Sequence, residues 1–162
     1  MEITFKPARA EEMDALLMLC RSAAMGCAQT TWDEEYPNRE ILQWDIDNGA
    51  LFTVWLGEEQ IGLLSMGQAE EELDSLTWRL PAKKPCEFAR FGLKKEWQGK
   101  GAASRVLQAA FAHSAARGYD AVRILVSRSF EHGCRLYEKN GFVRCGEASL
   151  WDCDFYCYDR AL

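Results

Sequence analysis

The spacing of apolar residues divides the chain into amphipathic helices and short strands. Met13, Leu16, Leu17, Cys20 and Ala24 recur at helical spacing, which predicts a helix with one buried stripe. The same criterion predicts three further helices, over residues 38–48, 104–117 and 129–139. Apolar runs bounded by turn-forming residues predict seven strands, over residues 3–6, 51–56, 60–66, 86–93, 121–127, 142–145 and 151–158.

These elements follow one another without a repeat, a low-complexity tract or a linker. The 162 residues are therefore interpreted as a single domain, 1–162. Residues 68–85 are polar and contain Pro81 and Pro85, which predicts a long loop. Long ordered loops are often functional, so this loop is a candidate part of a site.

Composition and charge narrow the range of functions. Hydrophobic residues make up 48% of the chain and charged residues 27%, which is typical of a globular domain. The net charge of -6 argues against nucleic acid as the main partner and favours a cationic small molecule or a basic peptide. No apolar run has the length of a membrane span and no signal peptide pattern is visible, so we expect a cytoplasmic protein without a membrane partner.

The seven cysteines are scattered along the chain. Their odd number favours reduced thiols over a disulfide framework. Cys153 and Cys157 lie close in sequence, but no second close pair or nearby histidine completes a zinc site. We therefore expect no metal.

The segment Gly99-Lys100-Gly101-Ala102-Ala103 lies directly before a predicted helix. A turn of small residues at a helix N-terminus leaves backbone N–H groups free to bind phosphate. A P-loop is excluded, because Gly99-Lys100 is followed by Gly101 and no glycine stands at the required spacing upstream. A dinucleotide-binding turn fits poorly, since Ser104 replaces the third glycine and Asp120 precedes its strand. A plain surface turn remains the competing interpretation.

Two motifs on the predicted elements carry a resemblance to a known family. Gln98-x-x-Gly101-x-Ala103 matches the Gln/Arg-x-x-Gly-x-Gly/Ala signature of the GNAT N-acetyltransferase superfamily. The segment Leu136-Tyr137-Glu-Lys-Asn-Gly141-Phe142 is similar to that family's Leu-Tyr-x-x-x-Gly-Phe element. Residues 32–46 also resemble a small bacterial branch of the superfamily. The resemblance implies an α/β (α+β) fold, with about four helices on a mixed, mostly antiparallel sheet of about seven strands.

In this family the ligand is acetyl-coenzyme A. The resemblance implies that its pyrophosphate lies on the turn that Gln98 opens, held by the backbone amides of residues Gly99, Lys100, Gly101, Ala102 and Ala103. Whether the Lys100 side chain adds charge or is a solvated loop lysine stays open. The pantetheine arm would pair with the strand around Phe91 and Leu93, and the amide of Leu93 would polarise the thioester carbonyl.

Tyr137 falls where the family places a tyrosine near the leaving sulfur. A phenol has a pKa of about 10 and a thiol one of about 8.5, so full proton donation to the thiolate runs uphill. We therefore predict that Tyr137 donates a hydrogen bond to the sulfur. The competing interpretation is a core aromatic ring with its hydroxyl at the surface.

Glu87 matches the position of the catalytic glutamate in the histone-acetylating branch of the superfamily. An attacking amine with a pKa of about 10.4 must lose a proton before it reacts. Burial beside Cys86 and Phe88 would raise the pKa of Glu87 toward that of a useful base. A glutamate that points outward from its strand is an equally weighted alternative, and many family members use a water chain instead.

The chain departs from the family at Phe130, where many relatives carry an asparagine that contacts coenzyme A, which calls that side-chain contact into question. Ser129 is expected to cap the following helix. Three aromatic residues in polar segments are candidates to wall an acceptor pocket: Trp32, Tyr36 and Trp78. His113 and His132 have no partner carboxylate in view and are left out of the site.

The activity that the resemblance implies is acetyl transfer from acetyl-coenzyme A to a primary amine of a small molecule or peptide by direct attack. The acceptor would enter between residues 29–37 and 68–85, where Glu34, Glu35 and residues 70–72 would attract a cation. A protein N-terminal or lysine acetyltransferase and an acyl-coenzyme A-binding regulatory module without turnover remain alternatives. The oligomeric state, a homodimer included, stays open.

Overall fold

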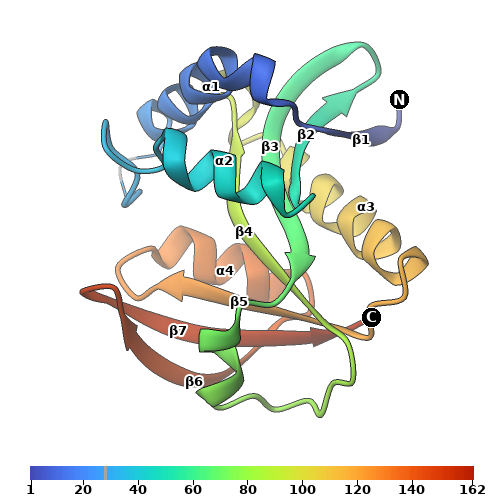
Figure 1. Ribbon diagram of the computed structural model, residues 1–162, viewed down its shortest axis with the longest axis vertical. Helices are drawn as coiled ribbons and strands as arrows, with labels where there is room; N and C mark the ends of the chain where they lie inside the picture. Colours follow the sequence, from blue (N-terminus) through green and yellow to red (C-terminus); the bar gives the residue numbers. More distant parts are fainter. Residues whose placement is uncertain (28) are drawn as a thin grey trace.

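The computed structural model describes residues 1–27 and 29–162. Its seven strands form one sheet in the order β1-β2-β3-β4-β5-β7-β6 (Figure 1). Neighbouring strands are antiparallel except β4 and β5, which are parallel. The strands are β1 (Ile3–Pro7), β2 (Leu51–Leu56), β3 (Glu59–Gln68), β4 (Pro85–Leu93), β5 (Ala121–Ser127), β6 (Val143–Leu150) and β7 (Cys153–Ala161). The mixed, mostly antiparallel sheet expected from the sequence is confirmed.

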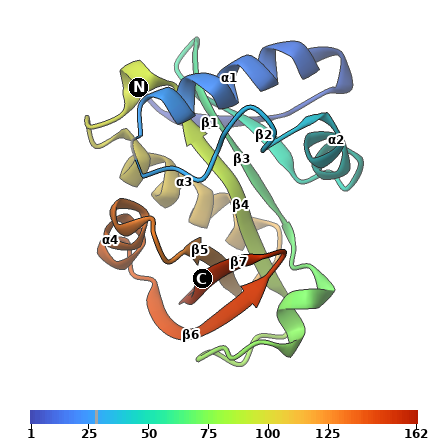
Figure 2. The ribbon, with the colours of Figure 1, turned by 90° about the vertical axis from the view of Figure 1, so that its left-hand side faces the viewer.

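In the described residues, four helices cover the sheet on both sides. They are α1 (Met13–Met25), α2 (Arg39–Asp47), α3 (Ala102–Ala116) and α4 (Glu131–Lys139). Three short 3-10 turns, η1 (Ala10–Glu12), η2 (Glu71–Ser75) and η3 (Lys95–Trp97), complete the elements of the described chain. Seen along its edge, β4 has α2 on one side and α3 on the other (Figure 2). The two faces of β4 therefore look into different surroundings.

Each side of the sheet has its own core. The larger core packs α3 against the sheet through buried apolar residues that include Val106, Leu107 and Phe111. The smaller core joins Leu16 of α1 and Leu42 of α2 to Leu51 and Leu63 of the sheet. Burying these apolar side chains is the main favourable contribution to the stability of both layers.

The strands β4 and β5 run together for only three residue pairs, from Pro85 to Glu87 on β4. On its other side β4 pairs with β3 from Cys86 to Leu93, and within this pairing two residues of β4, Arg90 and Phe91, lie opposite a single residue of β3, Leu64. Such a bulge bends the strand that carries the extra residue. The C-terminal half of β4 is therefore turned away from β5, as Figure 1 shows.

The ends of several elements differ from the sequence expectation. The third helix begins at Ala102, not at residue 104, because Gly101 at φ +76° already starts the turn. The buried stripe of α1 includes Leu19 and Ala23 in place of Leu17 and Ala24. Trp151 lies in the turn between β6 and β7 with φ +53°, so the last strand starts later than expected.

Helix starts were predicted with mixed success. The Oδ1 atom of Asn38 accepts a hydrogen bond from the N–H of Ile41 at 3.0 Å, which confirms Asn38 as the N-cap of α2. The predicted cap of α4 by Ser129 is wrong. Its hydroxyl instead contacts that of Ser127 at 3.0 Å, and Phe130 is the N-cap residue.

The long connection expected over residues 68–85 is found as residues 69–84, between β3 and β4, with η2 inside it. The indole Nε1 of Trp78 donates to the carbonyl of Leu73 at 2.6 Å. The buried carboxylate of Asp159 accepts from the N–H of Leu80 at 2.7 Å. These bonds fix the connection against β7, so the groups at its start have a defined position beside β4.

Candidate functional site

The turn before α3 has the geometry of an anion site. Gly99 and Gly101 have φ values of +74° and +76°, and a Cβ atom at either would meet nothing within 4 Å. Among the described residues, no group accepts a hydrogen bond from the backbone N–H groups of residues 99–103. The positive end of the dipole of a 15-residue helix lies behind them. Open space, free donors and a positive field together favour phosphate.

The side chain of Gln98 holds this turn in place. Its Nε2 atom donates to the carbonyl of Ala23 at 2.9 Å and to the carbonyl of Leu93 at 3.0 Å. Gly26 lies so close that a Cβ there would be 2.6 Å from Oε1 of Gln98. The side-chain amide nitrogen of Gln98 thus binds the C-terminal ends of α1 and β4. These two hydrogen bonds position the turn that follows.

Lys100 is exposed at the tip of the turn, with its Nζ 5.7 Å from the centre of the Trp97 ring. Both interpretations of this lysine from the sequence remain open, because an exposed ammonium can stay solvated or move to a phosphate.

The C-terminal end of β4 offers a free backbone donor. Leu93 is paired with Gly62 of β3, while the next residue, Lys94, donates its N–H to the carbonyl of Ile61 at 2.8 Å. In an antiparallel pair with this pattern, the N–H and C=O of Leu93 point away from β3. The C=O is taken by Gln98, and the N–H faces the side where β5 no longer pairs. Phe91, the other predicted residue here, is half-buried at the bulge against the larger core.

Tyr137 lies on α4 with its ring packed edge-on against Phe142, at 5.4 Å between ring centres. The side chain is partly buried, and within the described structure its hydroxyl has no hydrogen-bond partner. Burial raises the pKa of Tyr137 above its ordinary value. The phenol therefore keeps its proton at neutral pH and is a hydrogen-bond donor without a partner.

Phe130 at the start of α4 packs its ring onto the helix. A Cβ at Gly133 would lie 2.5 Å from the Phe130 ring, so a glycine is needed at that position. The carbonyl of Phe130 accepts the N–H of Cys134 at 3.1 Å. The phenyl ring offers no amide, so the side-chain contact expected of an asparagine has no counterpart here.

A cavity of about 720 Å³ lies on the other face of β4. It is enclosed by α2, the end of β3, the start of η2 and the turn between β6 and β7. Its lining includes five carboxylates and a single cation, Arg90, among the described residues. The carboxylates are Asp45, Glu70, Glu71, Glu72 and Glu87. A cavity with this charge favours a cationic ligand.

Glu87 is the deepest of these glutamates. Its Oε1 accepts a hydrogen bond from the backbone N–H of Glu70 at 3.0 Å. The pKa of Glu87 is raised to about 7, mainly by burial. The carboxylates of Glu70 and Asp45 also raise this pKa, whereas the hydrogen bond from Glu70 and the charge of Arg90 lower it. A raised pKa of Glu87 was expected from the sequence, through burial beside Cys86 and Phe88. Those two residues belong to the larger core, whereas Glu87 lines the cavity on the opposite face.

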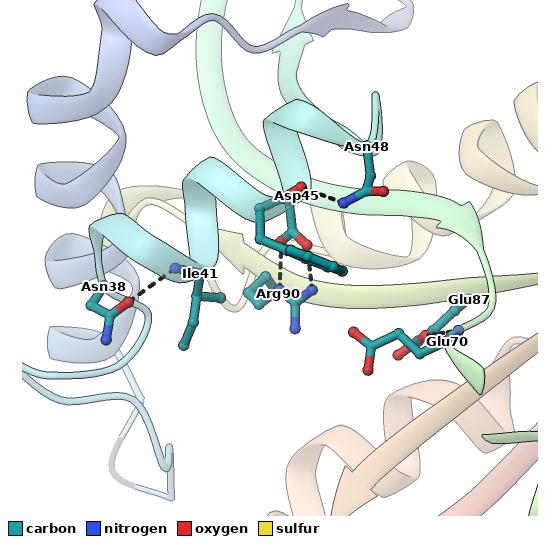
Figure 3. A network of polar contacts seen from close by, with 8 residues as sticks. Asn38, Ile41, Asp45, Asn48, Glu70, Glu87 and Arg90 are labelled. Atoms are coloured by element: carbon teal, nitrogen blue, oxygen red, sulfur yellow. Dashed lines mark hydrogen bonds and ion pairs between the residues drawn. The ribbon is translucent and has the colours of Figure 1, made fainter. Parts of the chain in front are cut away.

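Asp45 and Arg90 form a two-point ion pair in the cavity wall (Figure 3). The Nε and Nη2 atoms of Arg90 each lie 2.6 Å from a carboxylate oxygen of Asp45. Neither residue was expected from the sequence. Asp45 lies on the buried stripe of α2 beside Leu42, where a carboxylate in sequence gives no sign of a partner.

The aromatic residues at this cavity are not the three that the sequence offered as walls of an acceptor pocket. None of Trp32, Tyr36 and Trp78 lines it; the two tryptophans that do are Trp44 and Trp151. Both are largely exposed, at 61% and 58%. An exposed tryptophan beside an acidic cavity can bind a cation through its ring face.

The two histidines lie outside these features. His113 packs between Phe5 and Phe52, at 5.3 and 5.0 Å between ring centres, and burial lowers its pKa. His132 is exposed. Over the described ranges 1–27 and 29–162, no group of three His, Cys, Asp or Glu side chains is arranged to hold a metal ion. In the same ranges, every helix is too short or too polar to span a bilayer.

Comparison with known proteins connects these features to a family. The model of the acetyltransferase (GNAT) family matches residues 14–142. A GNAT acetyltransferase structure from Streptococcus agalactiae 2603 superposes with a TM-score of 0.82 at 20% identity, over 99% of this chain and 95% of that one. No curated protein sequence matches significantly.

Two further structures share the fold and contain coenzyme A. The PaiA N-acetyltransferase of Thermoplasma acidophilum, in complex with coenzyme A, gives a TM-score of 0.70 at 19% identity over 100% of both chains. AAC(6')-Ib, in complex with ribostamycin and coenzyme A, gives 0.77 at 14% identity over 99% of this chain and 94% of that one. At these identities the likeness shows a shared fold.

Proposed function

We propose, from the premise that this chain belongs to the acetyltransferase (GNAT) family, that it transfers the acetyl group of acetyl-coenzyme A to a primary amine of a cationic small molecule or peptide. The observation that carries the proposal is the course of β4. This strand pairs with β5 only as far as Glu87, whose side chain lines the acidic cavity. It ends at Leu93, whose backbone N–H is free on the edge of β4 that faces away from β3. It then leads into the turn of free N–H groups. One strand thus connects an acceptor side and a donor side.

The donor side fits coenzyme A on the residues present. The turn at residues 99–103 offers free N–H groups, open space and a helix dipole to a pyrophosphate. The unpaired edge of β4 after Glu87 offers backbone groups to an extended, amide-containing arm. Acetyl-coenzyme A supplies the acetyl group as a thioester, whose carbonyl carbon the acceptor nitrogen attacks while the C–S bond breaks.

Two groups of the chain would stabilise the charges that develop. The N–H of Leu93 would donate to the thioester oxygen as it becomes an oxyanion, and a fixed donor of this kind contributes about 3 kcal/mol of transition-state stabilisation. The hydroxyl of Tyr137 would donate to the sulfur as it leaves. Because the pKa of Tyr137 is raised, it would act by hydrogen bonding and keep its proton.

Glu87 would take the proton from the attacking amine, directly or through one water. A pKa of about 7 suits this role, since at neutral pH the carboxylate is substantially ionised and still basic enough to accept a proton. Glu70, Glu71 and Glu72 would attract the ammonium form of the acceptor into the cavity.

Two measurements test the proposal. Isothermal titration calorimetry with acetyl-coenzyme A measures donor binding, and release of free thiol across a panel of amines measures turnover. The panel pairs each cationic amine with a neutral amine of similar size, and includes peptides with free N-termini or lysines. We expect binding, and turnover that is fastest with cationic amines. Binding without turnover on any amine would favour a regulatory module, and absence of binding would contradict the proposal.

A further inference from the structure

The ion pair between Asp45 and Arg90 joins α2 to the bulge of β4 (Figure 3). The two side chains are 4% and 13% exposed, so the pair is largely shielded from water. Two parallel N–H to oxygen bonds fix the orientation of a guanidinium as well as its distance. Arg90 is therefore held in one place on the cavity wall.

Arg90 is also the residue at which β4 changes course. Its φ of +46° lies in the left-handed region, which few residues other than glycine occupy. Such a backbone conformation persists when the surrounding structure holds it. The bidentate bond to Asp45 provides a constraint of that kind at the bulge.

Several charged groups surround Glu87. They come from every element around it: Asp45 on α2, Glu70, Glu71 and Glu72 at η2, Arg90 on β4 itself, and Arg123 at the paired position of β5. Arg123 is engaged elsewhere, in an ion pair with Asp74 at 3.8 Å. Arg90 lies in the cavity wall itself, and its charge lowers the pKa of Glu87 although it forms no hydrogen bond with it in the described structure.

We propose that Asp45 is a positioning residue that keeps the guanidinium of Arg90 from pairing with Glu87, and so leaves Glu87 free to accept a proton from the acceptor. A long arginine side chain released from Asp45 would meet two glutamates in the same cavity, Glu70 and Glu87 (Figure 3). A direct ion pair would stabilise the ionised form of Glu87 and weaken it as a base. The inference rests on the proposed function for the role of Glu87, but the ion-pair step can be tested without any substrate.

The test measures the protonation of Glu87 directly. The protein is labelled with glutamate enriched in ¹³C at the side-chain carboxyl, and the signal of Glu87 is identified by its loss in Glu87→Gln. In Asp45→Asn we expect the pKa of Glu87 to fall by about one unit, because the released guanidinium pairs with it. In kinetics with any amine that is turned over, the acidic limb of kcat/KM should move to lower pH by the same amount.

Asp45→Asn also removes a negative charge, which by itself lowers the pKa of Glu87. The substitution is therefore repeated in an Arg90→Gln background, as a double-mutant cycle. If Asp45 acts through Arg90, the fall in pKa should be less than half as large in that background. Asp47→Asn, at an exposed position of the same helix, is the matched control and should leave the pKa unchanged.

A fall of equal size in both backgrounds, or no fall with Arg90 present, would overturn the inference. If Asp45→Asn does not fold, Arg90→Lys tests the same step, because lysine cannot form the two-point bond and its ammonium can reach Glu87. An unchanged pKa of Glu87 in Arg90→Lys would then overturn it. A shifted NMR pKa with a pH profile that does not follow Glu87 would leave the inference standing and count against Glu87 as the base.

Discussion

The backbone N–H of Glu70 donates to a carboxylate oxygen of Glu87 at 3.0 Å, and this bond ties the connection after β3 to the N-terminal part of β4. A hydrogen bond from an N–H normally lowers a carboxyl pKa, yet the pKa of Glu87 is raised to about 7 because burial outweighs that bond. Glu87 is thus oriented by one neighbour while its surroundings disfavour its charge. Both conditions suit a general base.

The first prediction concerns the pH dependence of the reaction. With a cationic amine, kcat/KM should rise with pH through a limb centred near 7, as Glu87 loses its proton. Glu87→Gln should abolish this limb and lower kcat about 100-fold, the usual contribution of a general base. The measurement is a steady-state profile from pH 5.5 to 9 for both proteins. A limb that persists in Glu87→Gln would assign the titration to another group.

The second prediction concerns stability and needs no substrate. The pKa of Glu87 is higher in the folded than in the unfolded protein, so its stabilising contribution is complete below about 4.5 and is lost as pH rises toward 7. Glu87→Gln cannot ionise. It should therefore be close to wild type at pH 5 and more stable at pH 8, by about 2 kcal/mol after allowance for partial solvent access.

Urea denaturation at several pH values measures this difference. Glu58→Gln is the control, because Glu58 is exposed in the turn between β2 and β3 and its substitution should give no pH-dependent change. If Glu87→Gln raises the free energy of unfolding by the same amount at pH 5 and pH 8, the charge of Glu87 is not destabilising.

The third prediction concerns Tyr137. Tyr137→Phe removes one unpartnered hydroxyl and keeps the ring against Phe142, so the fold should be unaffected. We expect kcat to fall about tenfold or more, with the Kd for acetyl-coenzyme A nearly unchanged, because the donated bond forms only as the sulfur leaves. Tyr119→Phe, in the turn after α3, is the control. Turnover that survives in Tyr137→Phe would remove this residue from the chemistry.

The fourth prediction separates phosphate binding from backbone strain. Gly101→Glu places a carboxylate where the pyrophosphate is proposed to lie, and should abolish binding of acetyl-coenzyme A in calorimetry. The left-handed φ of Gly101 also makes any side chain cost about 1–2 kcal/mol. Gly49→Glu is a matched control, since Gly49 has a φ of +67° and equally open surroundings. It should lose similar stability and keep binding; loss of binding in both variants would point to misfolding.

The fifth prediction concerns the acceptor. Trp44→Ala and Trp151→Ala should each raise the KM for a cationic amine about twofold to fivefold, the range expected when a cation loses an exposed aromatic face. The Kd for acetyl-coenzyme A should not change, because both rings lie at the cavity on the opposite face of β4. A neutral amine of similar size should show no such increase. Equal effects on charged and neutral amines would indicate simple packing.

Much of the fold was readable from local signals. The side chain of Asn38 indicates the start of α2, because asparagine is a preferred N-cap residue. Gly99 and Gly101 indicate a turn before α3, because glycine permits positive φ angles. Signals of this kind depend on a few neighbouring residues, which is why the order of strands and helices was predicted nearly completely. The errors at element ends, such as Trp151, arise where tertiary packing decides between a strand and a turn.

The residues of the acidic cavity could be predicted less well from the sequence, because their contacts join residues that are far apart in the chain. Nothing near Asp45 in the sequence indicates that it faces Arg90, and nothing near Glu70 indicates that its N–H binds Glu87. These pairs form only when α2 and the connection after β3 are brought to the same face of β4. The sequence could name Glu87 through a resemblance, but the buried partners that set its properties required the structure.

The short junction between β4 and β5 has a mechanical consequence. With three residue pairs joining β4 and β5, the sheet consists of two parts, β1 to β4 and β5 with β7 and β6, that meet at a narrow junction. A molecule that hydrogen-bonds to β4 beyond this junction would occupy the place of a neighbouring strand there. The donor would then link the two parts of the sheet while it is bound, in addition to supplying the acetyl group. This link would be lost and formed again in each turnover.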